Sequence, residues 1–190
     1  MKSTILWILA ILFVLLYVIP ALRCFFKRIG CAMKLRRLCS RPRVTLRGTH
    51  PFWFLGSRSC KGCDLLIDTP SQVFAIKLFG VMHSGRVLVF RETGEYFFRR
   101  YASILLFVFN VFDGAFRQLP EYDFSKGEDL AAGRTRRDVL LLNPIPMEVR
   151  FQPHSGQEAV TGPGDDLFGM ELASLSHLIR IVENAARDGV

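Results

Sequence analysis

Residues 64–79, DLLIDTPSQVFAIKLF, contain two short β-rich runs that are joined by a Thr-Pro-Ser-Gln turn. If Asp68 pairs with Val73 across this four-residue loop, the antiparallel register brings Asp64 opposite Lys77. Alternate residues then share a face of the hairpin. One face is wholly apolar and is expected to lie in the core; its residues are Leu65, Ile67, Phe74, Ile76 and Leu78.

More strands are predicted downstream of this hairpin. The runs RVLVFR and YFFRRY flank a turn at Gly94 and predict a second hairpin within residues 86–101. The two hairpins together predict a four-stranded antiparallel meander. The runs 139–144 and 147–152 predict two further strands, and we interpret residues 113–138 as a long surface loop.

The end of the chain predicts a helix. A loop rich in Gly, Pro and Asp occupies residues 155–166. Beyond it, apolar residues recur at the spacing of one helical face over about four turns; they are Leu172, Leu175, Ile179, Val182 and Ala186. The predicted fold class is therefore α+β, with a mainly antiparallel sheet of about six strands followed by a C-terminal helix.

The N-terminus predicts a membrane anchor. Residues 5–22, ILWILAILFVLLYVIPAL, carry no charge, and a helix of this length measures about 27 Å, close to the thickness of a bilayer core. Trp7 and Tyr17 lie towards its two ends, where aromatic rings favour the interface. A cleaved signal peptide fits less well, because its apolar region is shorter and a small-residue cleavage site follows it. We expect one transmembrane helix that remains in the protein.

A cluster of basic residues follows this apolar run and sets the expected orientation. Only Lys2 and the amino terminus precede the run, so the positive-inside rule places the N-terminus outside and the C-terminal domain in the cytoplasm. Attraction to anionic lipid contributes about 1 kcal/mol of binding free energy for each Lys or Arg near the membrane surface. The expected membrane-surface residues are Arg23, Lys27, Arg28, Lys34, Arg36, Arg37, Arg41 and Arg43.

Two interpretations of this basic cluster stay open. Solvated charges that only fix the orientation are favoured over a specific site for a phosphorylated lipid headgroup. An apolar stripe at helical spacing runs beside the cations and predicts that the helix continues along the membrane interface; its residues are Leu22, Phe25, Phe26, Ile29 and Met33.

The 190-residue chain divides into an anchor and one domain. We expect a transmembrane anchor at 1–22, a basic juxtamembrane segment and linker at 23–63, and a cytoplasmic α+β domain at 64–190. The net charge of +8 belongs to the first two parts, because residues 1–63 hold twelve Lys and Arg and no acid. Residues 64–190 carry a net charge of −4. We therefore do not expect nucleic acid as a partner.

Motifs for a metal or a cofactor are incomplete in this sequence, and we predict neither group. Five cysteines, an odd number, argue against a disulfide framework in a cytoplasmic domain. Cys60 and Cys63 form a lone CxxC, whereas a structural zinc site needs two more ligands. The sequence also lacks a P-loop, a GxGxxG loop, a GxSxG elbow and an HExxH helix.

One stretch resembles a known catalytic element. The hairpin CDLLIDTPSQVFAIKLFG is similar, over about seventeen residues, to the catalytic hairpin of restriction-endonuclease-like (PD-(D/E)XK) nucleases. The resemblance implies catalytic roles for Asp64 and Lys77, with the acid on Mg²⁺ and the lysine steadying the attacking water or the phosphate. Ala75 stands where the family has its second acid, so the implied metal site is degenerate. Without the resemblance, the two residues form a cross-strand ion pair worth about 0.2–1 kcal/mol.

Two functional hypotheses follow from the sequence. The preferred one is a single-pass membrane protein whose cytoplasmic domain is a non-catalytic binding or scaffold module for an unknown protein partner. The alternative is a membrane-tethered nuclease-like enzyme with a degenerate or migrated metal site. The lipid bilayer, with an attraction to anionic lipid, is the partner common to both.

Overall fold

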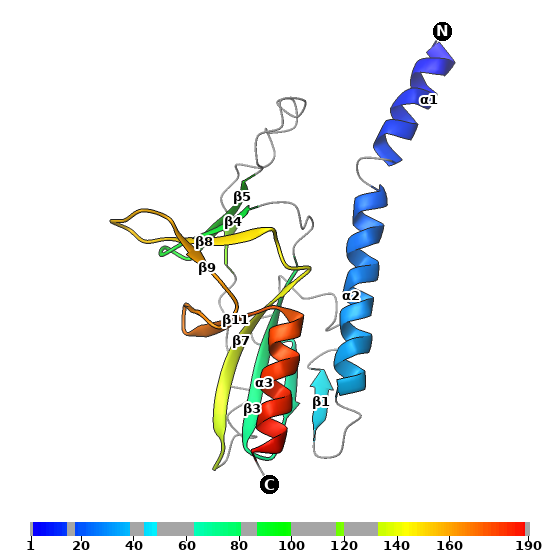
Figure 1. Ribbon diagram of the computed structural model, residues 1–190. Coiled ribbons are helices and arrows are strands. Elements are labelled where there is room, and N and C mark those ends of the chain that lie inside the picture. Colours follow the sequence, from blue (N-terminus) through cyan, green and yellow to red (C-terminus); the bar gives the residue numbers. More distant parts are fainter. Residues whose placement is uncertain are drawn as a thin grey trace.

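The structure, a computed structural model of the chain, describes residues 2–14, 18–38, 44–48, 63–80, 87–99, 117–119 and 133–188. This part of the chain contains two β-sheets and three helices (Figure 1). The helices are α1 (Lys2–Phe13), α2 (Ile19–Leu38) and α3 (Leu175–Arg187).

The larger sheet has six strands in the order β1-β2-β3-β7-β11-β10. Their bounds are β1 (Thr45–Gly48), β2 (Leu65–Asp68), β3 (Gln72–Gly80), β7 (Thr135–Asn143), β11 (Met170–Ala173) and β10 (Asp166–Leu167). The smaller sheet has five strands in the order β6-β5-β4-β8-β9. Their bounds are β6 (Arg117–Gln118), β5 (Glu95–Arg99), β4 (Val87–Arg91), β8 (Glu148–Gln152) and β9 (Ala159–Thr161).

The α+β class and the C-terminal helix are confirmed, but the predicted single, mainly antiparallel sheet is corrected to two mixed sheets. β7 pairs in parallel with β3 over nine residues and also in parallel with β11, and β4 pairs in parallel with β8. The predicted antiparallel meander is wrong for the same reason. β3 takes β7 as its second neighbour, so β4 and β5 belong to the other sheet.

The first hairpin has the predicted register. Asp68 pairs with Val73 and Leu65 with Ile76, and the ladder continues to a hydrogen bond of 2.9 Å from the Asp64 amide to the Ile76 carbonyl. The five residues predicted for the core face all lie in one buried cluster, in which their exposed fractions are 7% or less. A clean apolar alternation is thus sufficient to fix this register.

That core cluster lies between the larger sheet and two helices. α2 contributes Cys31, Ala32, Leu35 and Leu38, and α3 contributes Leu178, Val182 and Ala185. Figure 1 shows α3 in front of the sheet with the lower half of α2 beside it. β1 and all but the first four residues of α2 fall in the predicted juxtamembrane segment and linker, residues 23–63, and they share one core with the strands that follow.

A second core joins the two sheets. Residues from the far face of the larger sheet pack against the inner face of the smaller one; they include Phe79, Leu140 and Leu142 on one side and Leu88, Phe90 and Tyr96 on the other. The ring of Phe79 lies edge-on to that of Tyr96, with 4.9 Å between the centroids. The domain is thus layered as helices, large sheet and small sheet.

Several predicted boundaries need correction. α3 begins at Leu175, after Ser174 caps it by accepting a hydrogen bond of 3.1 Å from the His177 amide, and Leu172 lies in β11. The predicted loop 113–138 overlaps β7, whose first residue is Thr135, and the loop 155–166 contains β9. The first residues of β7 and all of β9 lack the long apolar run by which a strand is predicted from sequence. All of the apolar stretch 101–112 and most of the loop 113–138 lie outside the described residues.

The predicted transmembrane helix is not found as one described helix. α1 has 12 residues, about 18 Å in length, and α2 has 20 residues that include six Lys and Arg. Residues 15–17, between the two, are outside the described part. Among the described residues, no helix is both long and apolar enough to cross a membrane.

Candidate functional site

The Asp64–Lys77 pair lies inside the protein. Lys77 is in the middle of β3, and Asp64 directly precedes β2. The Lys77 Nζ lies 3.3 Å from the Asp64 Oδ1, and the Leu78 amide donates a hydrogen bond of 2.9 Å to the Asp64 Oδ2. The two side chains are 1% and 0% exposed. Both carboxylate oxygens therefore have partners within the sheet.

The surroundings of this pair are mainly apolar. Cys63, Leu66 and Ala75 form a small buried cluster on this side of the sheet, and Leu140 of β7 lies next to Lys77 in the ladder. In a buried pair such as this, attraction and desolvation nearly cancel, but the loss of one partner leaves the other charge unpaired. The arrangement is that of an internal ion pair.

Among the residues that the structure describes, no second carboxylate joins Asp64. Asp138 is adjacent to Ala75 on β7, but its Oδ1 accepts a hydrogen bond of 2.8 Å from the Arg136 Nε. Sheet geometry puts the Cα atoms of Asp64 and Asp138 about 12 Å apart, since the two residues are offset by two inter-strand spacings across the sheet and by two residues along the strand. Two ligands of one Mg²⁺ must each lie about 2.1 Å from it. Within the described residues, no group of three or more His, Cys, Asp and Glu could hold a metal ion.

The second candidate surface is the exposed apolar part of the N-terminal helices, which we call the apolar helical segment, residues 5–26. Apart from half-buried Ile19, its described large side chains are between 37% and 72% exposed. They are Ile5, Leu6, Trp7, Ile8, Ile11, Leu12, Val14, Val18, Leu22, Phe25 and Phe26. Figure 1 shows α1 and the upper part of α2 standing apart from both sheets. Exposed apolar side chains in this number are typical of a surface that is covered by a membrane or a partner.

The predicted membrane-surface cations lie at different places. Lys27, Lys34, Arg36 and Arg37 are exposed on α2. Arg28 is half-buried, and its guanidinium packs over Gly80 at the end of β3, where a Cβ atom would collide with it. Arg23 is in α2, but its side chain, like Arg41 and Arg43, is outside the described part. Lys27 thus directly follows the apolar helical segment, and Lys34, Arg36 and Arg37 lie about 12–17 Å beyond Phe26 along the helix axis.

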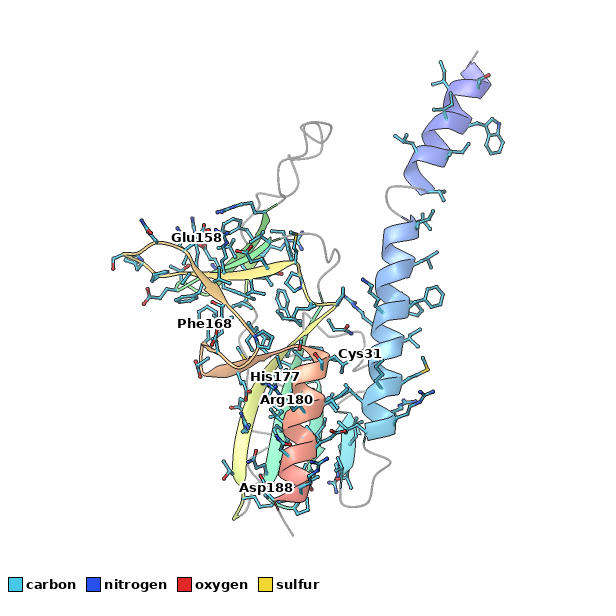
Figure 2. All side chains as sticks on the ribbon, viewed as in Figure 1. Cys31, Glu158, Phe168, His177, Arg180 and Asp188 are labelled. Carbon is cyan, nitrogen blue, oxygen red and sulfur yellow. The ribbon has the colours of Figure 1, made fainter. Side chains whose placement is uncertain are left out.

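The remainder of α2 is fixed to the domain. Figure 2 shows Cys31 on the side of α2 that faces the large sheet, and the residue is 3% exposed. Burial raises the pKa of the Cys31 thiol from 9.0 to about 12, although the nearby charge of Lys34 acts in the opposite direction. Burial also raises the pKa of Cys63, the described member of the CxxC. Both thiols are thus held in the neutral form.

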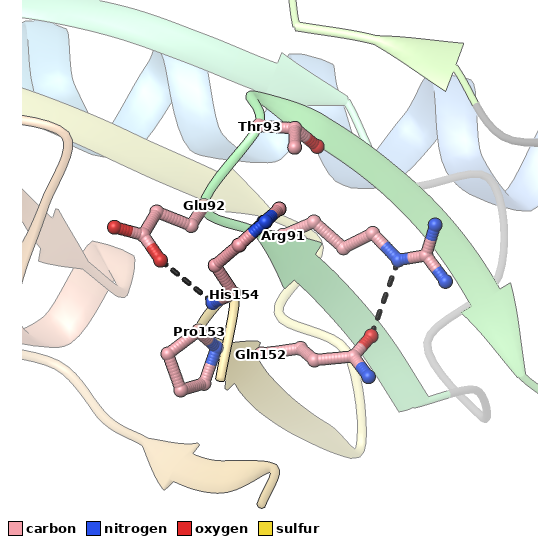
Figure 3. A pocket seen from close by; sticks show the side chains of 6 residues that line it. All are labelled: Arg91, Glu92, Thr93, Gln152, Pro153 and His154. Carbon is pink, nitrogen blue, oxygen red and sulfur yellow. Dashed lines mark hydrogen bonds between the residues drawn. The ribbon is translucent and has the colours of Figure 1, made fainter. Parts of the chain in front are cut away.

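Sequence reasoning missed a shallow cleft in the smaller sheet. The cleft measures about 240 Å³ and lies between the β4–β5 turn and the residues after β8; it is lined by Arg91, Glu92, Thr93, Gln152, Pro153 and His154 (Figure 3). The Arg91 Nε donates to the Gln152 Oε1 at 3.1 Å, and the His154 amide donates to the Glu92 Oε2 at 2.6 Å. Ligand pockets are usually larger, about 300–1,000 Å³. The polar atoms here mainly bind one another and hold the two turns together.

The described histidines and acids outside this cleft also take part in structural contacts. The His177 Nε2 lies 2.7 Å from the Glu171 Oε1, and the Arg137 Nη2 donates to the Glu171 Oε2 at 2.5 Å. This connects α3, β11 and β7. Glu158 is bonded by Arg99 and Arg150, and the hydrogen bond from Arg99 is the main reason that the pKa of Glu158 is lowered. His50 and His83 lie outside the described residues.

Compared with known proteins, the chain matches no family model, no curated protein and no solved structure. The resemblance of residues 64–80 to the nuclease hairpin therefore stays a prediction from the sequence.

Proposed function

We propose that this protein is a non-catalytic binding or scaffold module that its N-terminal helices hold at the cytoplasmic face of a membrane. The observation that carries the proposal is the exposed apolar helical segment, residues 5–26, which is followed at once by exposed Lys27. Leaving so many large apolar side chains in water would be costly, and a bilayer core removes this cost.

The length and the charges of the segment support a lipid environment. It comprises 22 residues, whereas about 20 apolar residues suffice to cross a bilayer. The proposal takes α1 and the first turns of α2 together as the embedded part, with Arg23 near the end, where a long side chain can reach the interface. The exposed cations of α2 then face the headgroups, and attraction to anionic lipid favours the cytoplasmic leaflet.

The contacts of the described residues in the domain favour a binding role over a catalytic one. Asp64 and Lys77 are buried and form an ion pair with each other, and polar residues of the shallow cleft form hydrogen bonds with one another. Catalytic groups need contact with a substrate in a cleft. The mildly acidic, layered domain is better suited to hold a protein partner near the membrane.

Flotation of the purified full chain with vesicles tests this function. We expect the chain to float with vesicles of phosphatidylcholine, and more completely when phosphatidylserine is added. A variant with Leu6→Asp, Ile8→Asp and Leu12→Asp should float about tenfold less, because each buried carboxylate costs several kcal/mol. The matched control carries Asp at three exposed polar positions of the domain: Thr135, Ser155 and Gln157. A wild-type chain that stays at the bottom of the gradient would refute the proposal.

A membrane-tethered nuclease-like enzyme is the second candidate, because Asp64 and Lys77 do lie side by side as the resemblance requires. It predicts cleavage of DNA or RNA that depends on Mg²⁺ or Mn²⁺ and disappears in Asp64→Asn and in Lys77→Met. If the wild-type chain shows no such cleavage, and the two substitutions change only the free energy of unfolding, the pair has a structural role alone.

A further inference from the structure

The turn between β7 and β8 carries an unusual pair of exposed apolar side chains. Its sequence is Pro-Ile-Pro-Met, residues 144–147; Ile145 is 43% exposed and Met147 is 66% exposed. The two prolines between and before them are buried and limit the freedom of the turn. Beyond the N-terminal helices, Val160 and Phe168 are the other large apolar residues that are exposed in the described part. Phe168, unlike this pair, packs its ring against Phe90 and Phe151.

Contacts in the larger sheet place this turn beside the apolar helical segment. β7 ends at Asn143, which pairs with Gly80, and the guanidinium of Arg28 packs over Gly80. Arg28 follows Phe26, the last residue of the segment, by about 3 Å along the helix axis. Figure 1 shows the yellow turn after β7 on the side of the domain that faces α2. The turn therefore begins at the level where the segment ends.

We propose that Ile145 and Met147 enter the interfacial layer of the same bilayer and form a second contact, which fixes the orientation of the domain on the membrane. This inference rests on the proposed function, because it needs the segment 5–26 to be embedded. Apolar side chains at such a level can reach the boundary between headgroups and acyl chains, where interfacial segments insert about 5–10 Å deep.

The charges around the turn suit a lipid surface better than an acidic or basic protein partner. Glu148, the residue after the turn, has its Oε1 at 2.5 Å from the Arg150 Nε, so its charge is compensated. On the side of α2, the exposed charges near the end of the segment are cationic, and no acid occurs before residue 64. Anionic headgroups would be attracted to this level of the protein.

Tryptophan quenching by brominated phospholipid tests this contact in the full chain. Trp7→Phe and Trp53→Phe remove both native tryptophans, and Met147→Trp then places a single reporter in the turn. Thr135→Trp is the matched control, since Thr135 is exposed at the start of β7, eight residues or about 26 Å along the strand from Asn143, where the turn begins. In vesicles whose lipids carry bromine near the top of the acyl chain, we expect quenching at position 147 to exceed that at position 135 by about twofold or more.

Flotation of the same samples separates the two ways in which the test can fail. Equal quenching at the two positions, in protein that floats with the vesicles, overturns the second contact and leaves the anchor in place. Protein that does not float overturns the proposed function, and the second contact with it. Stronger quenching at position 147 in floating protein supports both.

Discussion

At the scale of single residues, the Asp64–Lys77 pair is closed to solvent, and each oxygen of the carboxylate has a partner within the sheet. A shift of the hairpin by one residue would separate the two side chains and would also move Leu65, Ile67 and Phe74 out of the core. The complete burial of the pair could not be predicted. It depends on residues such as Leu140 on a strand more than sixty positions away.

A double-mutant cycle tests whether the pair is structural. Lys77→Met leaves the Asp64 carboxylate buried without its lysine and should lower the free energy of unfolding by about 3–5 kcal/mol. Asp64→Asn should have a similar effect, because the ammonium then loses its counter-charge. The double variant should be more stable than either single variant. Urea unfolding of the full chain in detergent measures all three.

The half-buried pair Arg91–Glu95, which is far more accessible than Asp64–Lys77, supplies a control for this cycle. Its N–O distance is 3.5 Å, and its side chains are 36% and 27% exposed, so its cycle should give a coupling of about 1 kcal/mol or less. If the effects of Lys77→Met and Asp64→Asn simply add, the two groups do not depend on each other and the ion-pair account is wrong.

Thiol reactivity is a second prediction at this scale. A rise in the pKa of Cys31 from 9.0 to about 12 reduces its thiolate fraction at pH 8 by about a thousandfold, so iodoacetamide should modify it only after unfolding. The raised pKa also predicts that stability falls as pH rises from 9 towards 12, because only the unfolded state then ionises this thiol. Mass spectrometry of the Cys31 peptide measures the alkylation; rapid modification of the native chain would contradict the assignment.

At the scale of elements, α2 shows why helical periodicity alone was insufficient. The predicted stripe of Leu22, Phe26 and Met33 is exposed, whereas Cys31 and Leu35 face the core. Both faces are apolar, and one sequence cannot say which of them packs on a sheet and which stays exposed. β7 presents the same difficulty, since its apolar run predicted a strand but gave no sign of its parallel partners β3 and β11. Parallel partners are distant in sequence and leave no turn motif.

Substitutions on the two faces of α2 should have opposite consequences. Leu35→Ala removes a fully buried side chain between α2 and the large sheet and should lower the free energy of unfolding by about 2–5 kcal/mol. Met33→Ala, on the face where the side chain is 52% exposed, should change it by about 0.5 kcal/mol or less. Equal effects of the two substitutions would mean that α2 does not belong to the domain core.

At the scale of the whole molecule, charge and hydrophobicity divide the chain in the same place. The apolar helical segment ends at Phe26, exposed cations follow on α2, and the folded domain that begins beside them carries the acids of the protein. The sequence was sufficient to predict this division and the α+β class. It could not indicate that the basic helix is also part of the domain core, because that depends on packing against distant strands.

The proposed orientation gives a prediction at this scale. In sealed membrane vesicles with the cytoplasmic face inside, an added protease should leave residues 28–190 intact, and in inverted vesicles it should digest the exposed parts of the domain. The physical reason is that eight cations follow the apolar run and one lysine precedes it. Immunoblotting against the C-terminus measures the protection, and digestion in the first kind of vesicle would reverse the assigned topology.

The fluorescence of Trp7 tests the central claim most directly. Trp7 is 68% exposed on α1, and Trp53→Phe leaves it as the sole tryptophan of the chain. If the apolar helical segment enters the bilayer, brominated phospholipid should quench Trp7 strongly, and its emission should shift to shorter wavelength when vesicles are added. Emission that remains unshifted and unquenched, in folded protein mixed with excess vesicles, would contradict the account.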